Sequence, residues 1–137
     1  MTPTPLNRRQ FSIATGAALV AGFHTAQAQE ERIVLGQSAA FTGPAAQLGI
    51  QFHAGAKLYF DLLNAQGGVG RRAIEIRQLD DGYEPDRCVA NTKKLIDDDV
   101  FALFGYIGTP TSVAALSLAT KARMPFFAPF TGAMALR

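Results

Sequence analysis

Short apolar runs alternate with helix-like stretches along this chain, and short links join them. The runs cover 32–39, 73–79, 101–107 and 125–130, and the first and third are largely continuous in apolar character (RIVLGQSA and FALFGYI). Such runs are typical of strands buried on both faces, whereas the alternating run AIEIRQL at 73–79 indicates a strand nearer the sheet edge or with one wetter face. The order βαβαβαβ with short links requires right-handed crossovers between parallel strands. The sequence therefore predicts an α/β fold built on one parallel sheet.

Apolar residues spaced three and four apart predict three helices, which cover 44–66, 85–96 and 110–123. Pro44 suits an early helical position, so Thr42 is the expected N-cap of the first helix. Gly55 is expected where that helix approaches the sheet closely. The residues expected to face inward are Leu48, Phe52, Tyr59, Leu62 and Leu63 in the first helix, Cys88, Thr92, Leu95 and Ile96 in the second, and Val113, Leu116 and Thr120 in the third.

Residues 1–28 have the three parts of an export signal in the right order. Arg8-Arg9 is a twin-arginine pair, an apolar stretch follows at 11–23, and Ala26-Gln27-Ala28 is a cleavage site of the A-x-A type. The apolar stretch is too short to cross a bilayer, which takes about 20 residues. We expect a mature chain from residue 29 onward, exported by the twin-arginine route or, as the alternative, by the general secretory route.

The charge of the expected mature chain is balanced. The formal net charge of the whole chain is +2. Removing Arg8 and Arg9 from its 13 Lys and Arg leaves 11, which equals the 11 Asp and Glu. A balanced surface gives no reason to expect nucleic acid as a partner.

Three loops built from small, hydroxylic, Gly and Pro residues follow predicted strands, at 38–44, 108–112 and 130–133. The carboxyl ends of parallel strands meet at one edge of a sheet, and open α/β sheets bind ligands at that edge. Helix N-termini there present unpaired N–H groups and the positive end of the helix dipole, which favour anions. The sequence therefore predicts a small-molecule site at this edge.

Thr109 is the residue on which this site is expected to depend. Gly108 before it allows close backbone approach, and Thr109 occupies the expected N-cap position. Its hydroxyl, with the Thr111 N–H, can cradle a carboxylate, and Thr131-Gly132 after the next strand places a second hydroxyl nearby. The alternative interpretation is an ordinary N-cap without a ligand.

The remaining chemical groups do not form a pattern typical of catalysis, cofactor binding or metal binding. The Gly-rich run at 67–70 precedes a strand, so it indicates a helix stop and not a dinucleotide loop. Asp80 and Asp81 can in principle do acid–base work or bind a hard cation, but loop capping is favoured because no His or third acid is near. Cys88, the single cysteine, is expected to be a small buried residue, and His53 lacks a catalytic partner. We therefore expect no enzyme, no cofactor and no metal.

Several stretches of the chain, taken together with their order and spacing, resemble one family. They are similar to stretches of the periplasmic substrate-binding proteins of ABC transporters, in the branched-chain amino-acid (leucine/isoleucine/valine-binding) family. The matching stretches are 33–36 (IVLG), 42–49 (TGPAAQLG), 63–70 (LNAQGGVG), 80–81 (DD), 104–109 (FGYIGT) and 125–129 (PFFAP).

The resemblance implies a periplasmic, non-catalytic receptor for an amino acid or similar small carboxylate, with an ABC transporter permease as its partner. It also implies a type I periplasmic binding protein fold with two lobes, of which residues 29–137 would form part of the N-terminal lobe. Because the chain stops where a fourth helix is expected, we expect the domain to continue beyond it. A ligand-sensing domain of a receptor and an enzyme on a similar sheet are the alternatives.

The same resemblance implies a set of ligand-binding residues: Leu48, Ile107, Gly108, Thr109, Phe130, Thr131 and Gly132. Leucine-binding members have an aromatic residue at the position of Leu48 and a threonine at that of Gly132, and both differences count against leucine itself as the ligand. Some members join two loops by a disulfide, and the matching positions here are Tyr83 and Gly108, so that bond cannot form.

Overall fold

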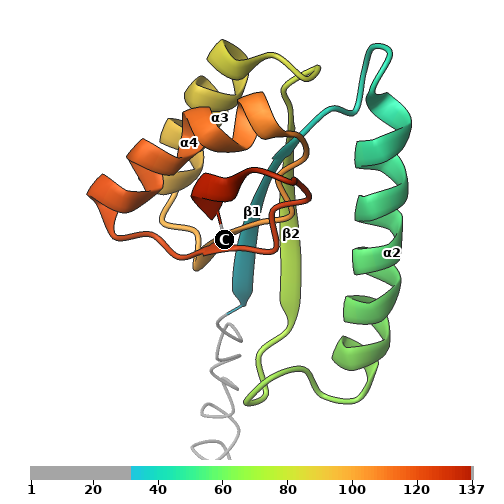
Figure 1. The fold of residues 1–137 in the computed structure, drawn as a ribbon. Helices are drawn as coiled ribbons and strands as arrows, with labels where there is room; N and C mark the ends of the chain where they lie inside the picture. The colour runs from blue at the N-terminus through green and yellow to red at the C-terminus, as the bar shows by residue number, and fades with distance from the viewer. Residues whose placement is uncertain (1–31, 137) are drawn as a thin grey trace, which may run out of the picture.

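The four apolar runs form the strands of one parallel sheet (Figure 1). The structure is a computed structural model and describes residues 32–136, so the predicted export signal lies outside the described residues. The elements are β1 (Ile33–Ala39), α2 (Ala46–Ala65), β2 (Ile74–Asp80), α3 (Pro85–Asp97), β3 (Ala102–Phe104), α4 (Thr109–Ala122), β4 (Phe126–Phe127) and the 3₁₀ helix η1 (Met134–Leu136).

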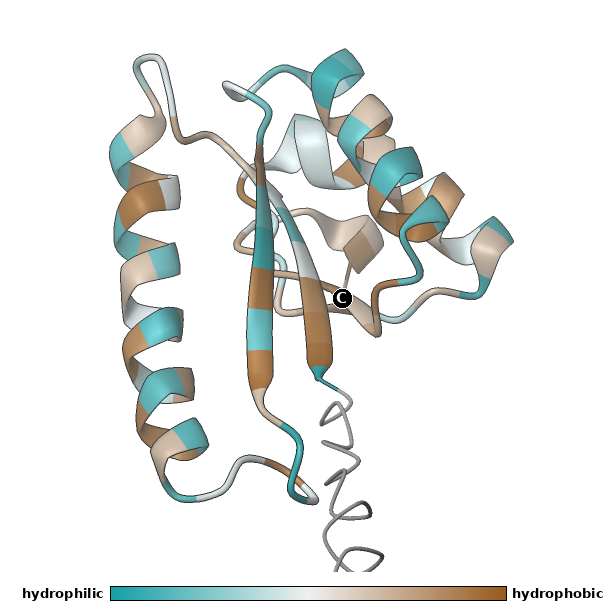
Figure 2. Ribbon diagram, turned by 180° about the vertical axis from the view of Figure 1, so that it is seen from behind, coloured by the Kyte–Doolittle hydropathy of each residue, from teal (hydrophilic) through white to brown (hydrophobic). Residues whose placement is uncertain are grey.

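The strand order is β2-β1-β3-β4, and all three neighbouring pairs are parallel. The predicted α/β class and the edge position of the second strand are therefore confirmed. Helix α2 covers one face of the sheet, and α3 and α4 cover the other (Figures 1 and 2). All the loops that follow the strands consequently leave from the same edge of the sheet.

The core lies between the sheet, α3 and α4. It contains Cys88, Leu95, Val100, Leu103, Tyr106, Ala115 and Ala119. The predicted inward face of α3 is confirmed for Cys88, Thr92 and Leu95, which are buried, while Ile96 is half-buried. Burial raises the pKa of the Cys88 thiol to about 12, so this cysteine stays a neutral small residue of the core.

The predicted inward face of α2 is wrong in part. Leu48, Tyr59 and Leu62 are at least half exposed. Phe52 and Leu63 are half-buried as predicted, and Phe60, which was not predicted to face inward, is half-buried as well. Apolar residues are spread around this helix (Figure 2), so their spacing alone does not identify one face.

Gly49, not Gly55, determines how α2 approaches the sheet. A Cβ built on Gly49 would lie 2.0 Å from the Ala40 carbonyl oxygen, while one built on Gly55 would meet nothing within 4 Å. The close approach at Gly49 turns the Phe52 and Phe60 rings toward Phe104, with centroid distances of 5.8 and 5.6 Å.

The expected inward face of α4 is also wrong in part. Val113 and Thr120 are exposed, and Leu116 is half-buried. The buried residues of α4 are Thr111, Ser112, Ala115 and Ala119. Small side chains let this helix pack closely, so here size rather than hydrophobicity selects the buried face.

The third and fourth strands are shorter than predicted. Gly105 has a φ of +64° and a Cβ there would lie 2.4 Å from the Phe52 ring, so the chain leaves the β3 ladder at this glycine. Pairing resumes as a single parallel bridge between Ile107 and Phe130. This bridge holds the loops after β3 and β4 together at the carboxyl edge.

Gly49→Ala should lower the free energy of unfolding by about 1–3 kcal/mol, because the new methyl group must displace the Ala40 backbone. Gly55→Ala is the matched control, since it adds the same methyl group to the same helix in open space. It should raise stability by up to about 1 kcal/mol through helix propensity. Urea unfolding followed by circular dichroism measures both, and equal effects of the two substitutions would contradict the assigned packing.

Candidate ligand site at the carboxyl edge of the sheet

The hydroxyl groups of Thr109 and Thr131 meet at the surface of the carboxyl edge. Thr109 is the first residue of α4, Thr131 follows β4, and their Oγ1 atoms are 2.7 Å apart. The Ile107–Phe130 bridge, with the Gly108 N–H donating to the Phe130 carbonyl at 3.1 Å, brings the two loops into register. The expected convergence of these two loops is therefore present.

This hydroxyl pair has one proton free to donate. Each hydroxyl carries one proton, and only one of the two lies in the bond between the oxygens. Thr131 Oγ1 also accepts the Ala133 N–H at 3.1 Å, which uses a lone pair and no hydroxyl proton. One O–H group of the pair can therefore point toward a bound oxygen atom.

The N-cap of α4 is Gly108, so the prediction that Thr109 caps this helix is wrong. Gly108 has a φ of +96°, which favours glycine, and its carbonyl accepts the Ser112 N–H at 3.1 Å. Thr109 and Pro110 are helical, and no side chain caps the helix. Within residues 32–136, neither the Thr109 nor the Thr111 amide donates to a protein acceptor. Both lie at the positive end of the helix dipole, but only Thr109 is exposed. Thr111 is fully buried, so the expected contact of its N–H with a ligand is not available in this structure.

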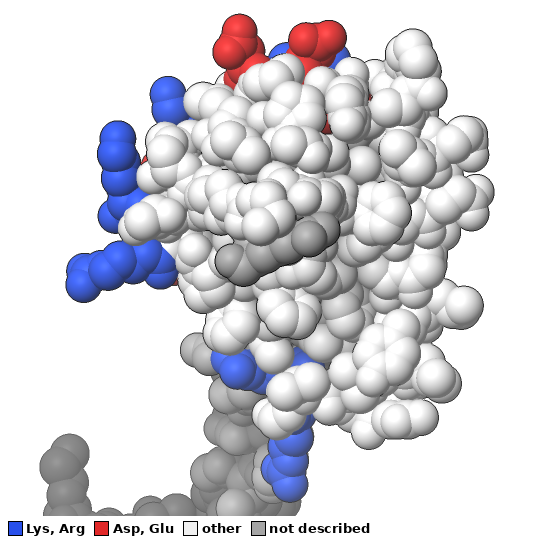
Figure 3. All heavy atoms as spheres, viewed as in Figure 1, with Lys and Arg blue, Asp and Glu red and all other residues white. Residues whose placement is uncertain are grey.

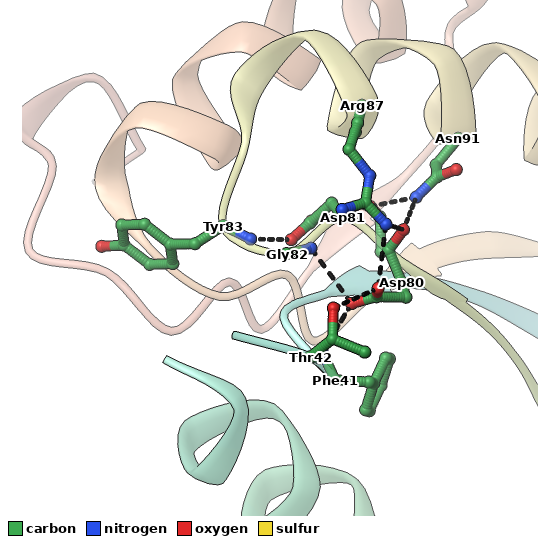
Figure 4. A network of polar contacts seen from close by, with 9 residues as sticks. Phe41, Thr42, Asp80, Asp81, Gly82, Tyr83, Arg87 and Asn91 are labelled. Atoms are coloured by element: carbon green, nitrogen blue, oxygen red, sulfur yellow. Dashed lines mark hydrogen bonds and ion pairs between the residues drawn. The ribbon is translucent and has the colours of Figure 1, made fainter. Parts of the chain in front are cut away.

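Asp80 ties the loop after β1 to the loop after β2. Its carboxylate accepts the Phe41 N–H at 2.8 Å, the Thr42 N–H at 3.1 Å and the Thr42 hydroxyl at 2.7 Å, and it pairs with Arg87 at 2.8 Å (Figure 4). Desolvation opposes ionisation, but these hydrogen bonds hold the pKa of Asp80 well below its usual range. Because Thr42 binds Asp80, it does not cap α2 as expected, and Ala45 occupies that position.

Asp81 points the other way, into the protein. It is fully buried and accepts the Ser38 hydroxyl at 2.8 Å and the Tyr83 N–H at 2.9 Å. Burial raises the pKa of Asp81. Both acids hold loops, as the loop-capping interpretation expects, and each is occupied by protein donors.

The structure links five of the seven predicted site residues directly. Ile107, Gly108, Thr109, Phe130 and Thr131 are connected by the bridge and by hydrogen bonds. Within residues 32–136, no hydrogen bond joins Leu48 or Gly132 to this group. Leu48 is half exposed in the first turn of α2, and Gly132 is exposed beside Thr131.

Tyr83 belongs to this edge, although sequence reasoning assigned it no role in ligand binding. Its ring rests against Gly108, at the start of α4. One sequence signal could have indicated this contact. Some proteins that the chain resembles have a disulfide between the positions of Tyr83 and Gly108, which means that these positions lie close together.

Other candidate groups have structural partners. His53 Nδ1 is 2.8 Å from the Gln37 amide oxygen, and Gln37 in turn donates to the Gly105 carbonyl. Burial lowers the pKa of His53. In the described part of the chain, no three His, Cys, Asp or Glu side chains gather as metal ligands would. No helix there is long and apolar enough to span a membrane.

A family model described as periplasmic binding protein matches residues 32–135. The chain belongs to this family. Among curated members, a leucine-, isoleucine-, valine-, threonine- and alanine-binding protein of Pseudomonas aeruginosa is 28% identical over 102 residues, which are 74% of this chain and 27% of that protein. The Leu/Ile/Val-binding protein of Escherichia coli is 31% identical over 96 residues, which are 67% of this chain and 26% of that protein.

Solved structures of similar proteins match the fold. A possible leucine/isoleucine/valine-binding protein of Rhodopirellula baltica gives a TM-score of 0.76 with 40% identity, covering 79% of this chain and 30% of that one. A branched-chain amino acid transporter substrate-binding protein of Streptococcus pneumoniae, in complex with isoleucine, gives 0.68 with 28% identity, covering 77% and 31%. An ABC transporter solute-binding protein of Rhodopseudomonas palustris, in complex with 3,4-dihydroxybenzoic acid, gives 0.65 with 32% identity, covering 74% and 28%.

These matches show that residues 32–136 have the sheet and helices of a periplasmic binding protein lobe. The aligned region is about a quarter to a third of the length of each relative.

Asp80→Asn should lower stability at pH 7 by about 1–3 kcal/mol, because it weakens hydrogen bonds made to a charged acceptor. The folded pKa lies below the unfolded value, so the stabilisation is present above about pH 4 and is lost as pH falls from there. Urea unfolding of both proteins between pH 7 and about pH 2 should therefore show a difference that shrinks in acid. Asp97→Asn, which removes the same charge elsewhere, is the control, and a pH-independent difference for Asp80→Asn would count against the assignment.

Proposed function

We propose that this chain is part of an extracytoplasmic solute-binding receptor that takes up an amino acid or similar small carboxylate and delivers it to the permease of an ABC importer. The observation that carries the proposal is the free O–H donor of the Thr109–Thr131 pair beside the open N-terminus of α4. Membership of the periplasmic binding protein family supports it.

The donors of the site suit the two oxygens of a carboxylate. The free hydroxyl proton addresses one oxygen, and the amide of the exposed Thr109 addresses the other at the positive end of the helix. The next residue, Pro110, has no N–H to compete for the ligand. The proposed ligand-binding residues remain Leu48, Ile107, Gly108, Thr109, Phe130, Thr131 and Gly132.

The described charged side chains lie away from the middle of this face. Figure 3, which includes α4 and the segment after β4, shows the Lys, Arg, Asp and Glu side chains of the described residues at the margins. Among residues 32–136, attraction of a carboxylate would therefore come from hydroxyl, amide and helix dipole rather than from a Lys or Arg. The exposed Phe130 and Leu48 offer apolar contact to the remainder of the ligand.

The ligands of two structural neighbours are consistent with one set of groups that binds the carboxylate and another that contacts the rest of the ligand. Isoleucine and 3,4-dihydroxybenzoic acid have different bodies but share a carboxyl group. We propose that this chain recognises that shared group, and that the body of its ligand is selected elsewhere in the site. Binding without chemical conversion, export through a signal at 1–28, a mature segment from residue 29 and a periplasmic location belong to the same proposal.

Isothermal titration of the full-length protein with isoleucine, 3,4-dihydroxybenzoate and octanoate tests the function. At least one carboxylate should bind, and its uncharged amide should bind far more weakly because it lacks the anionic oxygen. Equal binding of acid and amide, or no heat with any of the three acids, would argue against a carboxylate receptor.

Thr109→Ala should weaken binding of that carboxylate by about 1–3 kcal/mol, because it removes a hydroxyl that donates to a charged group. Thr109→Ser keeps the hydroxyl and should retain most of the affinity. Thr120→Ala removes an exposed hydroxyl from the other end of α4 and serves as the control. If Thr109→Ala and Thr120→Ala have the same affinity, the hydroxyl pair does not bind the ligand.

A further inference from the structure

Tyr83 closes over the backbone at the start of α4. A Cβ built on Gly108 would lie 2.4 Å from Cε2, 2.6 Å from Cζ and 2.7 Å from Oη of Tyr83. The phenol end of the ring therefore fills the space that any side chain at position 108 would need. Tyr83 as a whole residue is nevertheless 36% exposed, so it lies at the surface of the candidate site and not in the core.

The turn that carries Tyr83 is held in an unusual conformation. Tyr83 has a φ of +71°, which is uncommon and strained for a residue with a side chain. The buried Asp81 accepts the Tyr83 N–H through its side chain and the Glu84 N–H through its carbonyl, both at 2.9 Å. Figure 4 shows the ring directed away from the Asp80 cluster while its backbone nitrogen bonds to Asp81. Asp81 thus fixes the direction in which the ring projects.

Gly108 is the residue through which the ring can act on the site. Its N–H donates to the Phe130 carbonyl, and its own carbonyl accepts the Ser112 N–H, both at 3.1 Å. It therefore joins the first turn of α4 to the loop that carries Thr131. Any shift of Gly108 moves Thr109 relative to Thr131 and moves the open Thr109 amide as well.

We propose that Tyr83 is a positioning residue of the carboxylate site, which clamps Gly108 so that the Thr109 hydroxyl and amide keep their geometry. This inference rests on the proposed function. The contact is made by the ring, and within residues 32–136 no hydrogen bond to the Tyr83 hydroxyl is present. The ring and not its hydroxyl performs the role, so Tyr83→Phe preserves it and Tyr83→Ala abolishes it.

Two measurements on the full-length protein test this role. The first is amide hydrogen exchange without ligand, read at Ser112, because its N–H bonds to the Gly108 carbonyl. Tyr83→Ala should speed this exchange about tenfold relative to the β1 amides, since it loosens the first turn of α4 locally. Tyr83→Phe should leave it unchanged. Tyr59→Ala removes a ring of the same kind from an exposed position on α2 and is the control.

The second measurement is the affinity for isoleucine and 3,4-dihydroxybenzoate by isothermal titration. Tyr83→Ala should bind about tenfold more weakly than wild type, with Tyr83→Phe and Tyr59→Ala within about twofold of it. Unchanged exchange at Ser112 in Tyr83→Ala overturns the clamp, as does a loss of affinity in Tyr83→Phe equal to that in Tyr83→Ala. If wild type binds neither probe while exchange at Ser112 responds as expected, the proposed function fails for these carboxylates and the clamp stands.

Discussion

The single parallel bridge between Ile107 and Phe130 is the contact on which the candidate site depends. The β3–β4 ladder ends below it, because Gly105 turns the chain out of regular pairing. Without the bridge, the loops after these two strands would have no shared register. With the bridge in place, the side chains of Thr109 and Thr131, which are far apart in sequence, are joined by a hydrogen bond. The site is thus a product of backbone pairing, with side chains added to it.

The loops after β1 and β2, at the same carboxyl edge of the sheet, are held by two adjacent acids whose side chains point in opposite directions. Asp80 binds the loop after β1, and Asp81 fixes the turn that carries Tyr83. Strand geometry places neighbouring side chains on opposite faces, so one acid lies toward solvent and the other toward the core. Burial raises the pKa of Asp81, whereas the hydrogen bonds that Asp80 accepts outweigh its desolvation and lower its pKa. Both carboxylates accept hydrogen bonds from protein donors, as expected of acids that cap loops.

The parallel sheet and the meeting of Thr109 with Thr131 were predictable, because both follow from the alternation of strands and helices. The buried faces of α2 and α4 were predictable only in part. Apolar side chains are spread around α2, and backbone contact at Gly49, which no periodicity reveals, decides its rotation. In α4, small residues face inward.

Both N-cap predictions failed for a related reason. Thr42 and Thr109 have the right residue type, but each hydroxyl binds a tertiary partner, Asp80 in one case and Thr131 in the other. Those partners are distant in sequence. The same holds for the contact between Tyr83 and Gly108.

The bond between the two threonine hydroxyls has no fixed polarity. Either oxygen can be the donor, and reversing the bond moves the outward proton from one loop to the other without breaking any contact. In the proposed carboxylate site, the same pair would therefore meet an acidic group nearer β3 or one nearer β4 with no movement of the backbone. Selectivity for the body of the ligand would then change without loss of the bond to its acidic group.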